Sequence, residues 1–225
     1  MTTWAIVAAA GEGSRLGGGP KAFTPVGGSP MLSYSLVAFA KAGVDGIVVA
    51  VPPGLEGRTT DLAAETVPAA RVEVVAGGAS RQESVRRALA AIPDDAERIV
   101  VHDAARPLLT VELIDAALDG LDASAGAVVA LPLSDTVKRA PDGVVEATVP
   151  RDDLFRAQTP QAFRAPALRA AHGRAAAEGF EATDDAALLE WAGERVVIVG
   201  GNERNRKITT PEDLAWAETM LPEGG

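Results

Sequence analysis

The residues with the clearest chemical potential are two cations inside a glycine-rich loop near the start of the chain. The loop follows the apolar run 4–8 and reads Ala9-Ala10-Gly11-Glu12-Gly13-Ser14-Arg15-Leu16-Gly17-Gly18-Gly19-Pro20-Lys21. Glycine lets backbone N–H groups come close to a ligand, and clustered N–H groups with added cations form an anion-binding concavity. Arg15 and Lys21 in this setting predict a cradle for a nucleoside triphosphate.

Two better-known phosphate-binding loops do not match this segment. A Walker A loop needs Ser or Thr after its lysine, whereas Ala22 follows Lys21. The dinucleotide fingerprint G-x-G-x-x-G fits Gly11 and Gly13 but meets Leu16 where its third glycine should stand. The mismatch with the dinucleotide fingerprint disfavours a nicotinamide oxidoreductase. The alternative to a phosphate-binding loop is a flexible surface loop without a ligand.

Asp103 is the best-placed carboxylate, because it directly follows the apolar run 99–102. In an open α/β sheet, ligands bind outside the carboxyl ends of the strands. A carboxylate there suits Mg²⁺, which prefers oxygen ligands and keeps most of its waters; helix capping is the alternative role. We expect His102 to be structural rather than catalytic.

The elements that position these residues alternate along the chain. Strands are expected at 5–9, 46–51, 71–75, 99–102, 127–131 and 196–199, and helices at 31–42, 62–66, 80–91, 111–121, 166–178, 183–192 and 211–221. Continuous apolar strands indicate burial on both faces of a mainly parallel sheet. The alternation predicts an α/β, Rossmann-like, doubly wound fold in a single domain over 1–225. Ser80 with Glu83 predicts a capping box, and Thr110 a helix N-cap.

A different pattern begins at Pro132. Segments 132–139 and 144–149 flank Ala140-Pro141-Asp142-Gly143, a strong turn signal. This predicts a β-hairpin over about 132–150. An isolated hairpin is marginal in water, so it needs a surface to pack on.

Composition limits the function classes. The chain has 225 residues, 47% hydrophobic and 23% charged, as in ordinary globular proteins. Its formal charge of −10 argues against a nucleic-acid partner, so a phosphorylated ligand must meet a local basic site. The absence of cysteine excludes thiolate catalysis. We expect a cytoplasmic protein with no membrane partner, since no stretch resembles a signal peptide or a membrane span.

Several segments in a fixed order resemble a known family. The loop 9–21 resembles the signature of sugar-phosphate nucleotidyltransferases. The segments 75–85, 101–107, 158–163, 183–186 and 205–209 narrow the resemblance. Together they resemble the 2-C-methyl-D-erythritol 4-phosphate cytidylyltransferases of the non-mevalonate isoprenoid pathway, over about residues 5–218.

The resemblance implies a Mg²⁺-dependent enzyme that transfers CMP from CTP to 2-C-methyl-D-erythritol 4-phosphate and releases pyrophosphate. The residues that match the family's functional positions are the catalytic Arg15, Lys21 and Lys207, the nucleotide-binding Ala9, Ala10, Gly11, Gly13, Gly77, Gly78, Ser84, Asp103 and Ala104, and the acceptor-binding Arg106, Thr136, Arg151, Thr159 and Thr183. Asp103 would also hold the metal. In this family the hairpin embraces a second subunit, which implies a homodimer in which Arg151 acts in trans.

Alternatives stay open for individual residues and for the function. Ser84 has the alternative of an ordinary mid-helix serine, and Lys207 that of a surface lysine. Three other arginines are expected to be solvated or structural: Arg81, Arg86 and Arg206. Ribitol 5-phosphate is an alternative acceptor for the same chemistry. A non-catalytic nucleotide sensor on this fold is the other alternative, against which the retained charged residues argue.

Overall fold

The central sheet organises the molecule. The computed structural model describes residues 1–11, 13, 16 and 18–221. Within this part, a seven-stranded sheet has the order β11-β7-β10-β6-β1-β4-β5. Its strands are β1 (Thr3–Ala8), β4 (Gly46–Val51), β5 (Val72–Ala76), β6 (Arg98–Asp103), β7 (Gly126–Pro132), β10 (Phe155–Arg164) and β11 (Val196–Gly200).

The sheet is mainly parallel, as the sequence predicts. β1 pairs in parallel with β4 and β6, β4 with β5, and β11 with β7. The exception is β10, which runs antiparallel between β6 and β7 and shifts register between Ala157 and Gln161. The sequence analysis did not predict this strand, because the polar and proline residues 158–161 break its apolar pattern.

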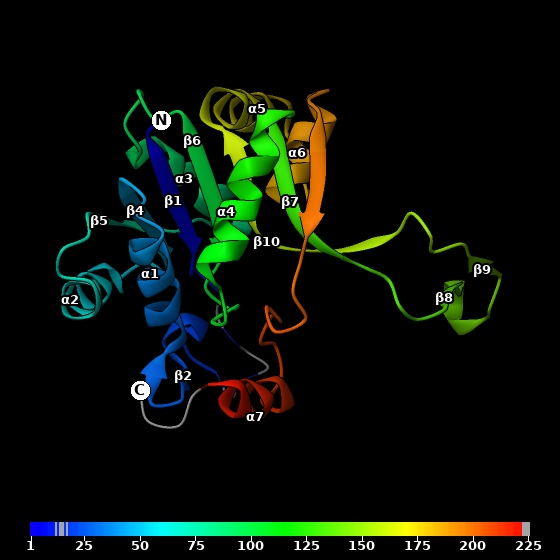
Figure 1. Cartoon of the computed structure of the whole chain (residues 1–225), viewed down its shortest axis with the longest axis horizontal. Helices are drawn as coiled ribbons and strands as arrows, with labels where there is room; N and C mark the ends of the chain where they lie inside the picture. The colour runs from blue at the N-terminus through cyan, green and yellow to red at the C-terminus, as the bar shows by residue number, and fades with distance from the viewer. Residues whose placement is uncertain (12, 14–15, 17, 222–225) are drawn as a thin grey trace.

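Helices cover both faces of the sheet, which confirms the doubly wound α/β sandwich (Figure 1). Side chains of α1 (Met31–Lys41), α2 (Glu56–Thr66) and α4 (Val111–Asp119) share one apolar core with the sheet. Those of α3 (Arg81–Ala91), α5 (Ala165–Glu178) and α6 (Asp185–Trp191) share a second core on the opposite face. The central strands are therefore buried from both sides, while the edge strands β5 and β11 stay partly exposed.

Local caps fix where the helices begin. Ser80 accepts a hydrogen bond from the Glu83 amide at the start of α3, so half of the predicted capping box forms. Thr110 stands at the N-cap position of α4, as predicted, although its side chain makes no cap hydrogen bond. The helix α2 begins at Glu56, six residues before the predicted start. The sequence analysis missed these first turns because they are polar and lack an apolar pattern.

The predicted hairpin forms and stands out from the body as an arm (Figure 1). β8 (Val137–Arg139) pairs antiparallel with β9 (Ala147–Val149). The turn between them places Asp142 at φ 52° and Gly143 at φ 80°, a left-handed conformation that Asp and Gly tolerate best. Below the sheet, α7 (Pro211–Met220) packs beside the short strands β2 (Pro25–Val26) and β3 (Ser29–Pro30). Among the described helices, none is long and apolar enough to cross a membrane.

Candidate active site

A cavity of about 610 Å³ opens at the carboxyl ends of β1, β4 and β6. We call it the strand-end cavity. The predicted site residues that line it are Ala9, Ala10, Gly11, Gly13, Lys21, Gly78, Ser84, Asp103, Ala104 and Lys207. The fold thus brings together residues that are up to almost two hundred positions apart in the sequence.

The glycine loop forms one wall of the strand-end cavity. The Lys21 amide donates to the Gly11 carbonyl oxygen at 3.1 Å, which folds the loop back on itself. Gly13 has φ +61°, and a Cβ there would lie 3.0 Å from the Gly19 oxygen. Glycine is therefore required at position 13. The predicted catalytic residue Arg15 lies outside the described residues.

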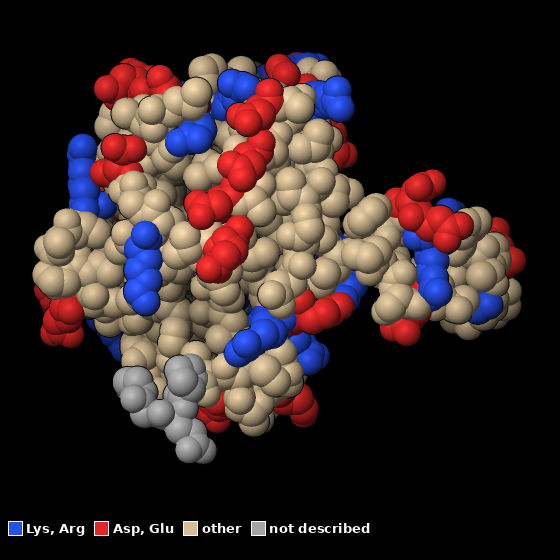
Figure 2. Space-filling model, in the orientation of Figure 1, with Lys and Arg blue, Asp and Glu red and all other residues tan. Residues whose placement is uncertain are grey.

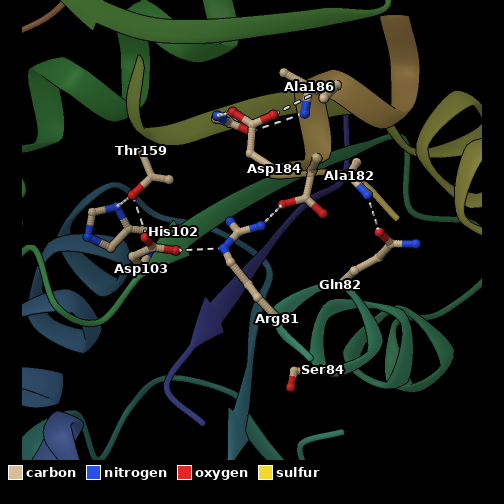
Figure 3. Close-up of polar contacts among 12 residues, drawn as sticks. Arg81, Gln82, Ser84, His102, Asp103, Thr159, Ala182, Asp184 and Ala186 are labelled. Carbon is tan, nitrogen blue, oxygen red and sulfur yellow. Dashed lines mark hydrogen bonds and ion pairs between the residues drawn. The ribbon is translucent and has the colours of Figure 1, made fainter. Parts of the chain in front are cut away.

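Asp103 lies at the end of β6, held by two cations, and Figure 3 shows its contact with Arg81. Its Oδ1 accepts from Arg81 Nε at 2.9 Å, and its Oδ2 accepts from Lys207 Nζ at 2.6 Å. Burial would raise the pKa of this carboxyl, but Arg81 and Lys207 outweigh burial and hold the pKa well below its ordinary value. Asp103 is ionised at neutral pH. It does not cap a helix, because α4 begins only at Val111.

His102 and Thr159 hold the backbone behind Asp103. The Asp103 amide donates to Thr159 Oγ1 at 3.0 Å, and the same oxygen lies 3.0 Å from His102 Nδ1. His102 Nε2 lies 3.1 Å from the Arg106 carbonyl oxygen, which can only accept, so Nε2 carries the proton. Complete burial lowers the pKa of His102 to about 4. The ring is therefore neutral at pH 7 and has the structural surroundings that we expected.

Of the two roles expected for Arg81, solvated or structural, its contacts support the structural one. It lines the strand-end cavity, and its side chain is 27% exposed. Its Nη1 donates to Asp185 Oδ2 at 2.7 Å, while its Nε holds Asp103 (Figure 3). The sequence places Arg81 at the first turn of a helix, where the direction of its side chain depends on tertiary packing.

Three of the predicted nucleotide-binding residues, Gly77, Gly78 and Ser84, form a tight corner at the start of α3. A Cβ on Gly77 would lie 2.6 Å from the Ala10 Cβ, so the corner has no room for a side chain. The Ser84 hydroxyl accepts from the Gly78 amide at 3.0 Å and donates to the Ser80 carbonyl oxygen at 2.8 Å. Ser84 is thus more than an ordinary helix serine, because it fixes the corner and still lines the cavity.

The predicted acceptor residues lie outside the described lining of the strand-end cavity. Arg106 donates to the carbonyl oxygen of Asn205, and Thr159 supports Asp103 as described above. Thr136 and Arg151 are exposed at the base of the arm, where Arg151 donates to the carbonyl oxygen of Ser134. Thr183 is exposed just before α6. The role of this group stays a prediction.

The residues present fit a Mg²⁺ ion that takes few ligands from the protein. Asp103 is an ionised carboxylate in the cavity wall. Among the described residues, no cluster of three or more His, Asp or Glu side chains could hold a metal alone. Mg²⁺ in phosphoryl-transfer sites keeps several waters and binds one or two carboxylates plus substrate phosphates, so a bound triphosphate would have to supply the remaining ligands.

The sequence analysis also missed Thr209, which lines the cavity wall next to Lys207. Its hydroxyl donates to Asp213 Oδ2 at 2.7 Å and thereby ties this wall to the start of α7. The segment 205–209 was available as a signal, since it belongs to the motifs that carried the resemblance.

The sheet order, the glycine-lined wall and the cations around one carboxylate define a class, the α/β nucleotidyltransferases. A family model described as IspD, 2-C-methyl-D-erythritol 4-phosphate cytidylyltransferase, matches residues 3–223. The chain belongs to this family of CTP-dependent cytidylyltransferases.

Similar proteins agree over nearly their whole length. The 2-C-methyl-D-erythritol 4-phosphate cytidylyltransferase of Deinococcus radiodurans is 47% identical over 97% of this chain and 89% of its own length. That of Cereibacter sphaeroides is 46% identical over 98% and 97%. The crystal structure of the Thermus thermophilus cytidylyltransferase is 36% identical, with a TM-score of 0.82 and 98% coverage of both chains. The fold and the order of the motifs are thus shared.

Proposed function

We propose that this protein transfers CMP from CTP to 2-C-methyl-D-erythritol 4-phosphate, yielding 4-diphosphocytidyl-2-C-methyl-D-erythritol and pyrophosphate. The observation that carries the proposal is the strand-end cavity, in which Lys21 and the Arg81–Asp103–Lys207 cluster face a glycine-lined wall. This is an anion-binding site that matches the chemistry named for the family. A cytoplasmic location follows from the proposal, because CTP is an intracellular nucleotide.

The reaction needs charge neutralisation more than covalent catalysis. A phosphate oxygen of the acceptor attacks the α-phosphorus of CTP, the bond to the bridging oxygen breaks, and pyrophosphate leaves with the electron pair. Such phosphoryl chemistry depends on positioning two anions and on stabilising the charge of the transition state. Lys21 and Lys207 line the cavity and would provide this stabilisation, together with Arg15.

Asp103 would hold the Mg²⁺ ion in this reaction. When bound, the ion would neutralise phosphate charge and orient the triphosphate. The Lys207 side chain is 42% exposed and contacts Asp103 only through its ammonium group. Because its four-carbon chain is flexible, the ammonium group can turn from the carboxylate toward a bound phosphate.

The acceptor site would be shared between two subunits. The arm stands away from the body of the molecule (Figure 1). Between its two strands it exposes Val144 and Val145, with 72% and 61% of their surface accessible. Exposed aliphatic side chains on a marginal hairpin favour burial against a second copy. Arg151, at the base of the arm, would then hold the acceptor phosphate of the partner's site.

Phosphorus NMR of the reaction mixture tests the proposal. The protein, CTP, Mg²⁺ and 2-C-methyl-D-erythritol 4-phosphate should give the paired signals of a diphosphate diester together with one equivalent of pyrophosphate. ATP should react far more slowly, because its purine base is larger than cytosine and the corner at Gly77 has no room for added atoms. Pyrophosphate without the diester would indicate hydrolysis and contradict a transferase.

A further inference from the structure

A second carboxylate lies behind the strand-end cavity, and the proposed reaction does not use it. Asp185, at the start of α6, accepts from Arg81 Nη1 at 2.7 Å and lies 3.0 Å from His172 Nε2 on α5. Arg81 continues the chain of contacts to Asp103 at 2.9 Å. Four side chains from α3, α5, α6 and β6 thus form one continuous polar network.

Stability alone explains this network poorly. Asp185 is 1% and His172 2% exposed, and buried ion pairs often stabilise a fold no better than apolar residues of the same size. Among the described residues, Arg81 Nη2 and His172 Nδ1 are buried without a hydrogen-bond partner. Each such atom costs free energy. The arrangement is better explained by what it holds in place.

The geometry of Arg81 suits a positioning role. A guanidinium is planar, so bonds from Nε to one carboxylate and from Nη1 to another fix both its plane and its distance from each. The charges also balance, since Arg81 and Lys207 face Asp103 and Asp185. In this state both oxygens of Asp103 are occupied by cations.

We propose that Arg81 is a positioning residue: fixed from behind by Asp185 and His172, it sets the orientation of the Asp103 carboxylate and limits its affinity for free metal ions. The proposal rests on the proposed function, in which Asp103 holds the metal. In this proposal, the Arg81–Asp185–His172 network lets Asp103 bind the metal ion only when a nucleotide supplies the remaining ligands.

The variants Arg81→Gln and Arg169→Gln form a matched pair. Arg169 also has a 27% exposed side chain, and it donates to the backbone carbonyl oxygens of Leu89, Ile92 and Pro93, outside the cavity lining. Both substitutions remove a partly buried guanidinium from the same face of the sheet. Both should lower the melting temperature, so this measurement records the structural loss that the two share.

Two further readouts separate the variants. Mn²⁺ binding without nucleotide, followed by electron paramagnetic resonance, should become about tenfold tighter in Arg81→Gln, because a competing cation has left Asp103. At saturating CTP and Mg²⁺, kcat should fall about tenfold or more, with a smaller change in KM. Arg169→Gln should match the wild type in both. Arg81→Lys should recover part of kcat, since it restores one charge but not the two-carboxylate span.

The proposal is overturned if Arg81→Gln resembles Arg169→Gln in both kcat and Mn²⁺ binding. Should Arg81→Gln fail to fold, Asp185→Asn carries the test, because it keeps the side-chain shape and should change both readouts in the same direction by a smaller factor. The Mn²⁺ measurement needs no turnover. A wild type that makes no pyrophosphate would therefore contradict the proposed function while leaving this comparison decisive.

Discussion

Among the described residues, three cationic side chains line the strand-end cavity, each from a different kind of segment. Lys21 follows the glycine loop, Arg81 begins a helix, and Lys207 lies in the loop after the last strand. A rigid carboxylate, Asp103, holds the latter two. Charges that are already in place stabilise a transition state without any rearrangement of the protein. Removing them one at a time should therefore show how much each contributes to the rate.

Replacement of Lys21 by alanine should lower kcat by about a hundredfold while CTP binding weakens by a smaller factor. The reason is that a charge aimed at the transferring phosphate acts mainly in the transition state. Steady-state kinetics and calorimetric CTP titration measure the two effects. Lys41→Ala, at the exposed end of α1, is the control. An unchanged kcat in Lys21→Ala would remove Lys21 from the catalytic role.

His102 should make the protein less stable in mild acid. Burial lowers its pKa to about 4 from an ordinary value of 6.5. Between these values the unfolded chain binds more protons than the folded one, so stability falls as the pH decreases. The free energy of unfolding should drop by about 2 to 3 kcal/mol from pH 8 to pH 4.5 through this residue alone. Urea titrations at both pH values should show a smaller drop for His102→Gln, and an equal drop would contradict the account.

At the scale of elements, the sequence predicted the parallel strands and missed the antiparallel one. Apolar runs located the parallel strands, and the positions after them located Asp103 and Lys207. The strand β10 was not predicted because Gln158 and Gln161 make its centre polar. It forms because it pairs with its two neighbours, β6 and β7. The ion pair between Arg81 and Asp185 could not be predicted for a similar reason, because no local sequence pattern shows that Asp185 lies opposite Arg81.

The corner between β5 and α3 should tolerate no added methyl group. A Cβ on Gly77 would lie 2.6 Å from the Ala10 Cβ and 2.9 Å from Ser84 Oγ. Gly77→Ala should therefore raise KM for CTP about tenfold by displacing the wall of the cavity. Gly173→Ala is the matched control: it lies within α5 with nothing within 4 Å of its Cβ position. That variant should keep its KM and gain about 0.5 to 1 kcal/mol of stability. Equal KM values in the two variants would contradict the tight corner.

At the scale of the whole molecule, the arm and the surface charge matter most. Figure 2 shows separate groups of acidic side chains, among them a row across the middle of the visible face, with basic side chains between them and both signs of charge on the arm. The net charge of −10 makes the basic strand-end cavity a local exception, as expected for a site selective for phosphorylated ligands. If the acceptor site is shared as proposed, the exposed arm packs on a second copy of the chain.

At an acceptor concentration below the raised KM, activity at a shared site should be restored by mixing two impaired variants. Arg151→Ala should raise KM for the acceptor phosphate, and Lys21→Ala should lose turnover. If Arg151 acts in trans, mixed dimers contain one site with both residues intact, and activity should recover to about a quarter of the wild-type value by random assortment. Subunit exchange is verified first by native mass spectrometry. No recovery after verified exchange would assign Arg151 to the site of its own chain.

The most direct test of the central claim is the choice of acceptor. Pyrophosphate release is measured with CTP and Mg²⁺, comparing 2-C-methyl-D-erythritol 4-phosphate with ribitol 5-phosphate. The account predicts turnover with the methylerythritol substrate and a kcat/KM at least about a hundredfold lower with ribitol 5-phosphate. Turnover with ribitol 5-phosphate alone, or with neither acceptor, would contradict it.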